Sequence, residues 1–294
     1  MPYVWHSKRF IFRWTGQDLF DAFAFIVIDL RLSQTHQFDK FLNCCYNRSV
    51  ATTKGTKLKT LYTELPLGSP LTSAALAKAG ISADLAVHYA RSGWLQRLAR
   101  GVYCRPGQPL SRDASLVALG DQVVGLHVGG KTALDWYGVR QYVSSHEILH
   151  LYGWVAASLP EWFVQRFPSE YHRKRLFSET PENMLHVGPF ESSERAPLTS
   201  DPERALLELL SEVGVRQPLP EAREIMESAY SMRADVLNSL LQHCTSVKTV
   251  RLCLQLAREL DLRWVSELEL DKLPRGSDRP WVSKSRDGLL VLKP

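Results

Sequence analysis

Apolar residues recur at helical spacing in the segment 57–68, at Leu58, Leu61, Tyr62 and Leu65. This pattern predicts a first helix, which ends where prolines and a glycine follow. In the segment 81–93, Leu85 and Tyr89 lie one helical turn apart, so we expect a helix that turns this side toward a core.

Segment 72–93 contains residue types that are typical of helix ends. Thr72 and Ser82 have hydroxyl oxygens that can cap the N-termini of two successive helices. Gly80 and Gly93 can end these helices, because glycine adopts the left-handed conformation without strain. The pattern therefore predicts a helix-turn-helix.

A short hairpin is predicted directly after the second helix, over residues 94–105. Arg100 and Gly101 supply its turn. Residues 106–109 read Pro-Gly-Gln-Pro and are typical of a linker. We therefore expect a winged helix-turn-helix domain over residues 56–109, at the start of an α+β protein.

The outward side of the second helix is the one that would enter a major groove if the domain binds DNA. The arginines of the hairpin and of its flank are suited to phosphate contacts. The predicted DNA-binding residues are Lys59, Ser82, Ala83, Asp84, Val87, His88, Arg91, Arg97, Arg100 and Arg105.

The net charge of the protein supports this interpretation. The whole chain of 294 residues carries a net charge of +5. Residues 57–105 hold seven basic residues against Glu64 and Asp84, so this segment alone accounts for the +5 and the other residues sum to zero. A basic surface on one small domain is typical of a nucleic-acid binder, whereas chance clustering on a solvated surface is the alternative.

The remaining residues, 110–294, predict a mixed α/β domain that ends in a helical section. Short apolar runs predict strands at 126–128, 148–152, 184–187 and 288–292. Residues 159–162 are expected to form a loop. The predicted helices are 114–119, 131–137, 202–213 with Ser200 or Asp201 as its cap, 221–229, 234–243 and 246–260.

Five cysteines without a C-x-x-C pair predict reduced thiols, and hence a cytoplasmic protein. No signal peptide is evident. The most apolar run, residues 19–30, is interrupted by Asp21 and Asp29 and is too short to span a bilayer, so we expect no membrane partner.

Residues 1–55 form an N-terminal extension that shows no cap, period or motif. Val50 is followed by a polar segment, so one hypothesis is that a non-ATG start codon lies there and that residues 1–49 are translated upstream sequence. A genuine extension that binds a partner is the alternative.

Residues 125–132 match the phosphate-binding pattern G-x-x-x-x-G-K-[ST]. The preceding strand would be only residues 122–124, Leu126 and Val128 are typical strand residues, and the following helix ends at Gly138. We therefore expect a structural glycine turn with Lys131 at the start of a helix, and no nucleotide cofactor.

Residues 146–150 match the zinc pattern H-E-x-x-H, and Glu170 could add a third ligand. The residues around Ile148 favour a strand, however. On a strand, His146 and His150 would be about 13 Å apart, which is too far for one zinc ion. We therefore predict a strand and no metal site.

Taken together, several segments in order give the chain a resemblance to the AbiEi-type antitoxins, which are transcriptional regulators of type IV toxin–antitoxin systems. The resemblance spans about residues 57–294 and rests on segments 91–103, 127–134, 150–153, 159–162, 201–210 and 246–251.

This resemblance implies that the winged helix binds inverted operator repeats, as two or more copies, and represses its own operon. It also implies that the C-terminal domain counteracts a nucleotidyltransferase-like toxin. It supplies no catalytic residue, so we expect no enzymatic activity.

Two other classes of function stay open on the sequence alone. One is a nucleic-acid-processing enzyme, a nuclease or nucleotidyltransferase, that the winged helix targets to its substrate. The other is a module that binds proteins, because winged helices also do so.

Overall fold

The computed structural model describes residues 57–60, 62–63, 67–139, 148–180, 182–190, 196–285 and 288–294. The hypotheses about the N-terminal extension and Val50 therefore lie outside the described residues. The chain divides into two compact units, Met1–Lys59 and Thr60–Pro294. Residues 57–60 and 62–63 are helical, as the apolar spacing predicts for this segment.

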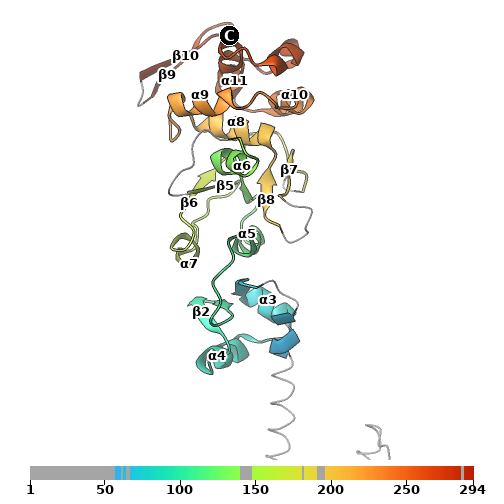
Figure 1. Ribbon diagram of the computed structural model, residues 1–294, viewed down its shortest axis with the longest axis vertical. Coiled ribbons are helices and arrows are strands. Elements are labelled where there is room, and N and C mark those ends of the chain that lie inside the picture. The colour runs from blue at the N-terminus through green and yellow to red at the C-terminus, as the bar shows by residue number, and fades with distance from the viewer. Residues whose placement is uncertain are drawn as a thin grey trace, which may run out of the picture. The chain divides into compact units, whose positions relative to one another are not determined.

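The winged helix forms as predicted, with one additional strand. Its helices are α3 (Ser73–Lys78) and α4 (Ala83–Arg91), and its hairpin strands are β2 (Gln96–Ala99) and β3 (Val102–Cys104) (Figure 1). The additional strand, β1 (Leu71–Thr72), pairs with β3 to give a sheet of order β1-β3-β2. This pairing joins the two ends of the domain, which the local pattern does not reveal.

The ends of these elements are set by the side chains that the sequence indicates. The hydroxyl of Thr72 accepts a hydrogen bond from the backbone N–H of Ala75 at 3.2 Å. The hydroxyl of Ser82 accepts one from the N–H of Leu85 at 3.3 Å. Gly101 occupies the hairpin turn with φ +74°, a conformation that favours glycine.

The C-terminal part is built on a mixed five-stranded sheet of order β6-β5-β4-β8-β7. Strand β5 runs antiparallel to β4 and parallel to β6, and β8 runs parallel to β4 and antiparallel to β7. The strands are β4 (His127–Val128), β5 (Leu149–Gly153), β6 (Ser169–Arg173), β7 (Val187–Pro189) and β8 (Leu198–Ser200).

The strand expected at 184–187 is wrong in its bounds. His186 adopts φ +54°, which turns the chain, so that the strand begins at Val187. The 159–162 loop is also only partly right, because a helical turn, α7 (Glu161–Val164), begins inside it.

Helices cover this sheet and form a helical section at the C-terminus. Helix α8 (Pro202–Glu212) lies between the sheet and the helices that follow it (Figure 1). It packs against α6 (Gly130–Trp136), α10 (Ala234–His243) and α11 (Val247–Glu259). Two short 3₁₀ helices, Arg263–Glu267 and Leu270–Lys272, lead into the final hairpin of β9 (Trp281–Ser285) and β10 (Gly288–Leu292). The α-helices are α5 (Arg112–Gly120), α6 (Gly130–Trp136), α8 (Pro202–Glu212), α9 (Leu219–Glu227), α10 (Ala234–His243) and α11 (Val247–Glu259).

A single large apolar core supports this arrangement. Its centre is α8 and α11, whose leucines Leu206, Leu210 and Leu252 are fully or almost fully buried. In the described part of the chain, no helix is long and apolar enough to cross a membrane.

Candidate nucleic-acid interface and a buried polar network

Helix α4 has one buried side and one solvent-exposed side. Ala86 and Tyr89 are buried at 1% and 5% exposure and hold the helix on its domain, while Leu85 is half-buried. The outward side is formed by the exposed residues Ser82, Ala83, Asp84, Val87, His88 and Arg91. All six are predicted DNA-binding residues.

The predicted phosphate-binding arginines lie on and next to the wing. Arg97 on β2 and Arg100 in the turn are both exposed. The guanidinium of Arg105 lies over the ring of Tyr62, 4.8 Å from its centroid, which holds this exposed side chain in one direction. Lys59 is also exposed, but it belongs to the other unit.

None of the arginines Arg91, Arg97, Arg100 and Arg105 forms an ion pair with a carboxylate of the described residues. Exposed arginines around an exposed helix face, without a carboxylate partner in the part of the chain that the structure describes, are the electrostatic pattern that nucleic-acid binders present.

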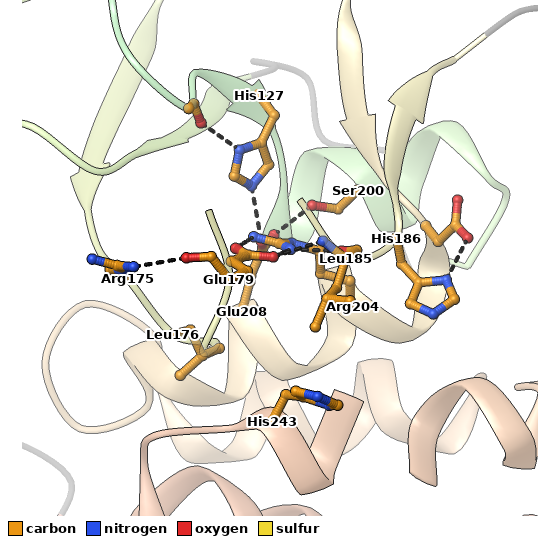
Figure 2. A network of polar contacts seen from close by, with 12 residues as sticks. His127, Arg175, Leu176, Glu179, Leu185, His186, Ser200, Arg204, Glu208 and His243 are labelled. Carbon is orange, nitrogen blue, oxygen red and sulfur yellow. Dashed lines mark hydrogen bonds and ion pairs between the residues drawn. The ribbon is translucent and has the colours of Figure 1, made fainter. Parts of the chain in front are cut away.

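The C-terminal part contains a second polar arrangement, which is closed to solvent. Glu208 of α8 lies at its centre and accepts hydrogen bonds from four groups; three of the donor residues, His127, Ser200 and Arg204, are labelled in Figure 2. Its Oε1 accepts from His127 Nε2 at 2.9 Å and from Arg204 Nε at 2.8 Å, and its Oε2 accepts from Ser200 Oγ at 2.9 Å and from the N–H of Gly130 at 3.1 Å.

Arg204 extends this network to the chain that precedes β7. Its guanidinium forms two parallel hydrogen bonds to the carboxylate of Glu179, at 2.7 and 2.8 Å, and a further one to the carbonyl of Leu185. Bidentate hydrogen bonds between arginine and a carboxylate are stronger than hydrogen bonds between neutral groups. Arg204, Glu179 and Glu208 are each at most 2% exposed in their side chains.

The electrostatics of Glu208 follow from these contacts. Burial would raise the pKa of its carboxyl, but the nearby charges and hydrogen bonds of His127 and Arg204 outweigh burial and lower the pKa to about 2. Glu208 is therefore ionised at neutral pH. Because its two oxygens accept four hydrogen bonds from the protein, we assign it a structural role, which is to hold β4, β8 and α6 on α8.

The segment that matches the phosphate-binding pattern belongs to this network. The N–H of Gly130, which would face a phosphate, donates to Glu208. Lys131 pairs with Glu221, and the hydroxyl of Thr132 donates to the carbonyl of Ile148. The N–H of Gly130 and the hydroxyl of Thr132 are thus engaged in contacts within the fold, and Lys131 is engaged in an exposed ion pair, as a structural role predicts.

The segment that matches the zinc pattern is only partly described, since His146 and Glu147 lie outside the described residues. His150 lies on strand β5, as predicted. Burial, together with the neighbouring His172, lowers the pKa of His150 to about 4, so its imidazole is neutral at pH 7.

Comparison with known proteins assigns the whole described fold to one family. Residues 54–145 match the N-terminal domain of the AbiEi antitoxin transcriptional regulators, and residues 146–293 match the transcriptional regulator, AbiEi antitoxin, of type IV toxin–antitoxin systems. The chain belongs to the AbiEi antitoxin family. The resemblance noted in the sequence is therefore confirmed.

Two other comparisons add nothing to the family assignment. No curated protein matches the chain. A crystal structure of the RV2827C protein from Mycobacterium tuberculosis is similar at 14% identity and a TM-score of 0.49, covering 79% of this chain and 89% of that one.

The AbiEi family is one of transcriptional regulators, and an exposed helix beside a basic wing suits that role. The buried network was not found from the sequence. Glu179, Arg204 and Glu208 are far from His127 along the chain. The one signal in the sequence that could have indicated the network is the spacing of Arg204, Glu208 and Glu212, which places them on one side of α8.

Proposed function

We propose that this protein is the DNA-binding antitoxin of a type IV toxin–antitoxin operon and represses that operon. In this proposal the outward side of α4 enters the major groove of an operator with inverted repeats, and the wing contacts the phosphates. The C-terminal part counteracts a nucleotidyltransferase-like toxin encoded beside it. Family membership supports the general role. The observation that carries the DNA interface is the set of exposed arginines on the winged helix, which have no carboxylate partner among the described residues.

The residues on α4 and those on the wing should differ in what they contribute to DNA binding. His88 and Arg91 lie on α4, where side chains reach base edges, so H88A and R91A should weaken binding to the operator more than binding to unrelated DNA. Arg97 and Arg100 lie on the wing, so R97Q and R100Q should weaken binding to all sequences.

Fluorescence anisotropy with the promoter fragment and with a shuffled duplex, at several salt concentrations, measures both effects. Each lost phosphate contact should flatten the slope of log K against log salt concentration by about 0.9. Arg263→Gln is the matched control, since Arg263 is exposed and lies in the C-terminal helical section. Unchanged affinity in all four winged-helix variants would refute the interface.

The antitoxin role has a separate test. Co-expression of the protein with the nucleotidyltransferase-like product of a neighbouring gene should restore growth that the toxin alone inhibits. R97Q and R100Q should lose repression of a promoter fusion but still restore growth, because the toxin is counteracted by the other part of the chain. Loss of both activities in these folded variants would contradict this division of roles.

The alternative of a nucleic-acid-processing enzyme is tested in the same preparation. Metal-dependent cleavage or nucleotidyl transfer that persists through purification would favour it.

A further inference from the structure

Strands β5 and β6 bring three metal-ligating side chains together. The strands are parallel, with His150 opposite Glu170 and Tyr152 opposite His172. Because side chains alternate between the two faces of a sheet, His150, Glu170 and His172 all lie on one face. One ligand atom from each of the three residues lies within 4.8 Å of those of the other two.

We infer that His150, Glu170 and His172 form a binding site for a divalent first-row transition metal, of which zinc is the best match. Two imidazoles and one carboxylate are a donor set that zinc accepts, and a fourth position stays open for water or for a group of a partner. The site uses His172 in place of the His146 of the sequence pattern, and it is independent of the proposed function.

The geometry of the two histidines fits this assignment. His150 Nδ1 and His172 Nε2 face each other at 3.1 Å. Two nitrogen ligands at about 2.0–2.1 Å from a tetrahedral zinc ion lie about 3.3–3.4 Å apart, so the rings need to separate by only a few tenths of an ångström.

The surroundings of His172 supply the outer contacts that such sites use. Its second nitrogen, Nδ1, lies 3.6 Å from Glu212 Oε2 and accepts a hydrogen bond from Arg216 Nη1 at 2.9 Å, so without a metal ion the proton of the neutral ring is on Nε2 and points to His150 Nδ1. A metal ion on Nε2 leaves the proton of the neutral ring on Nδ1. Glu212 is then the acceptor for this proton, and Arg216, half exposed, moves off Nδ1 and keeps its contact with Glu212.

A metal ion also has a route to the site. Strand β6 is at the edge of the sheet, and Glu170 on it is exposed, while His150 is half-buried and His172 is buried. The backbone at His150 is held in place, because its N–H donates to the hydroxyl of Thr132 at 2.8 Å. The backbone that carries His150 is thus fixed, and the carboxylate of Glu170 faces the solvent.

The test is a titration of the full chain, freed of metal with a chelator, with zinc alone against a competing chromophoric chelator. The wild type should bind one zinc ion per chain, and cobalt should produce visible absorption bands at the same stoichiometry. H150Q and E170Q should bind zinc at least about tenfold more weakly, because removing a ligand costs no less than removing its outer-shell partner.

His243→Gln is the matched control, since His243 is an exposed histidine on α10 that lies outside the cluster. Glu170 is exposed, so E170Q should keep the native circular dichroism spectrum, and zinc should raise the melting temperature of the wild type more than that of E170Q. The inference is overturned if the folded wild type binds no zinc, or if E170Q and H150Q bind zinc as tightly as the wild type does.

Discussion

Replacing Glu208 by alanine should remove a large part of the stability of the C-terminal part. The substitution leaves four buried donors without their acceptor, on His127, Gly130, Ser200 and Arg204. It also leaves the guanidinium of Arg204 with the carboxylate of Glu179 as its one charged partner among the residues that the structure describes.

The magnitude follows from the burial of the pair. Removing one member of a buried ion pair costs about 3–5 kcal/mol, because the other charge stays in the protein interior. Glu259 provides a control with the same charge change, since it pairs with Arg223 at 2.6 Å but the two side chains are 41% and 42% exposed. E259A should cost no more than about 1 kcal/mol, because water replaces the lost contact.

Urea denaturation followed by circular dichroism measures this difference. If E208A costs about 4 kcal/mol and the denaturant dependence is about 2 kcal/mol per molar urea, the midpoint should fall by about 2 M. The midpoint of E259A should fall by less than about 0.5 M. A midpoint for E208A equal to that of E259A would refute the structural role of Glu208.

Three other predictions test the same structure. Since the pKa of Glu208 is lowered from 4.5 to about 2, its stabilisation should be complete above about pH 4.5 and be lost as the pH falls toward 2; urea midpoints measured across this range should fall more steeply for the wild type than for E208Q. Gly129→Ala should destabilise by about 1–3 kcal/mol, because its Cβ would come 2.2 Å from the Glu208 carboxylate, whereas Gly120→Ala meets no atom within 4 Å and should be neutral in the same thermal melts. In anisotropy titrations, R97Q combined with R100Q should flatten the salt dependence of DNA binding by about twice the amount of either change alone, and equal slopes for the single and double variants would contradict separate phosphate contacts.

The local features of this protein follow from the sequence itself. Thr72 and Ser82 cap their helices, and Gly101 turns the hairpin, because each of these groups acts on residues within about four positions along the chain. Helical spacing of apolar residues likewise predicts the helices 234–243 and 246–260, which form as α10 (Ala234–His243) and α11 (Val247–Glu259). The outward side of α4 was equally predictable, since helical periodicity separates its faces.

The contacts between distant segments required the tertiary structure. Strands β6 (Ser169–Arg173) and β8 (Leu198–Ser200) are short, and their sequences do not show which strand they pair with. Pairing of β6 with β5 is what brings His172 to His150, and packing of α8 on the sheet is what buries Glu208 beside His127. A charged residue on a helix is expected in water unless partners compensate it, and those partners lie 78 or more residues away for His127 and Gly130. The sequence alone therefore determined the winged helix and its exposed basic face, whereas only the folded chain decided which histidines and carboxylates meet.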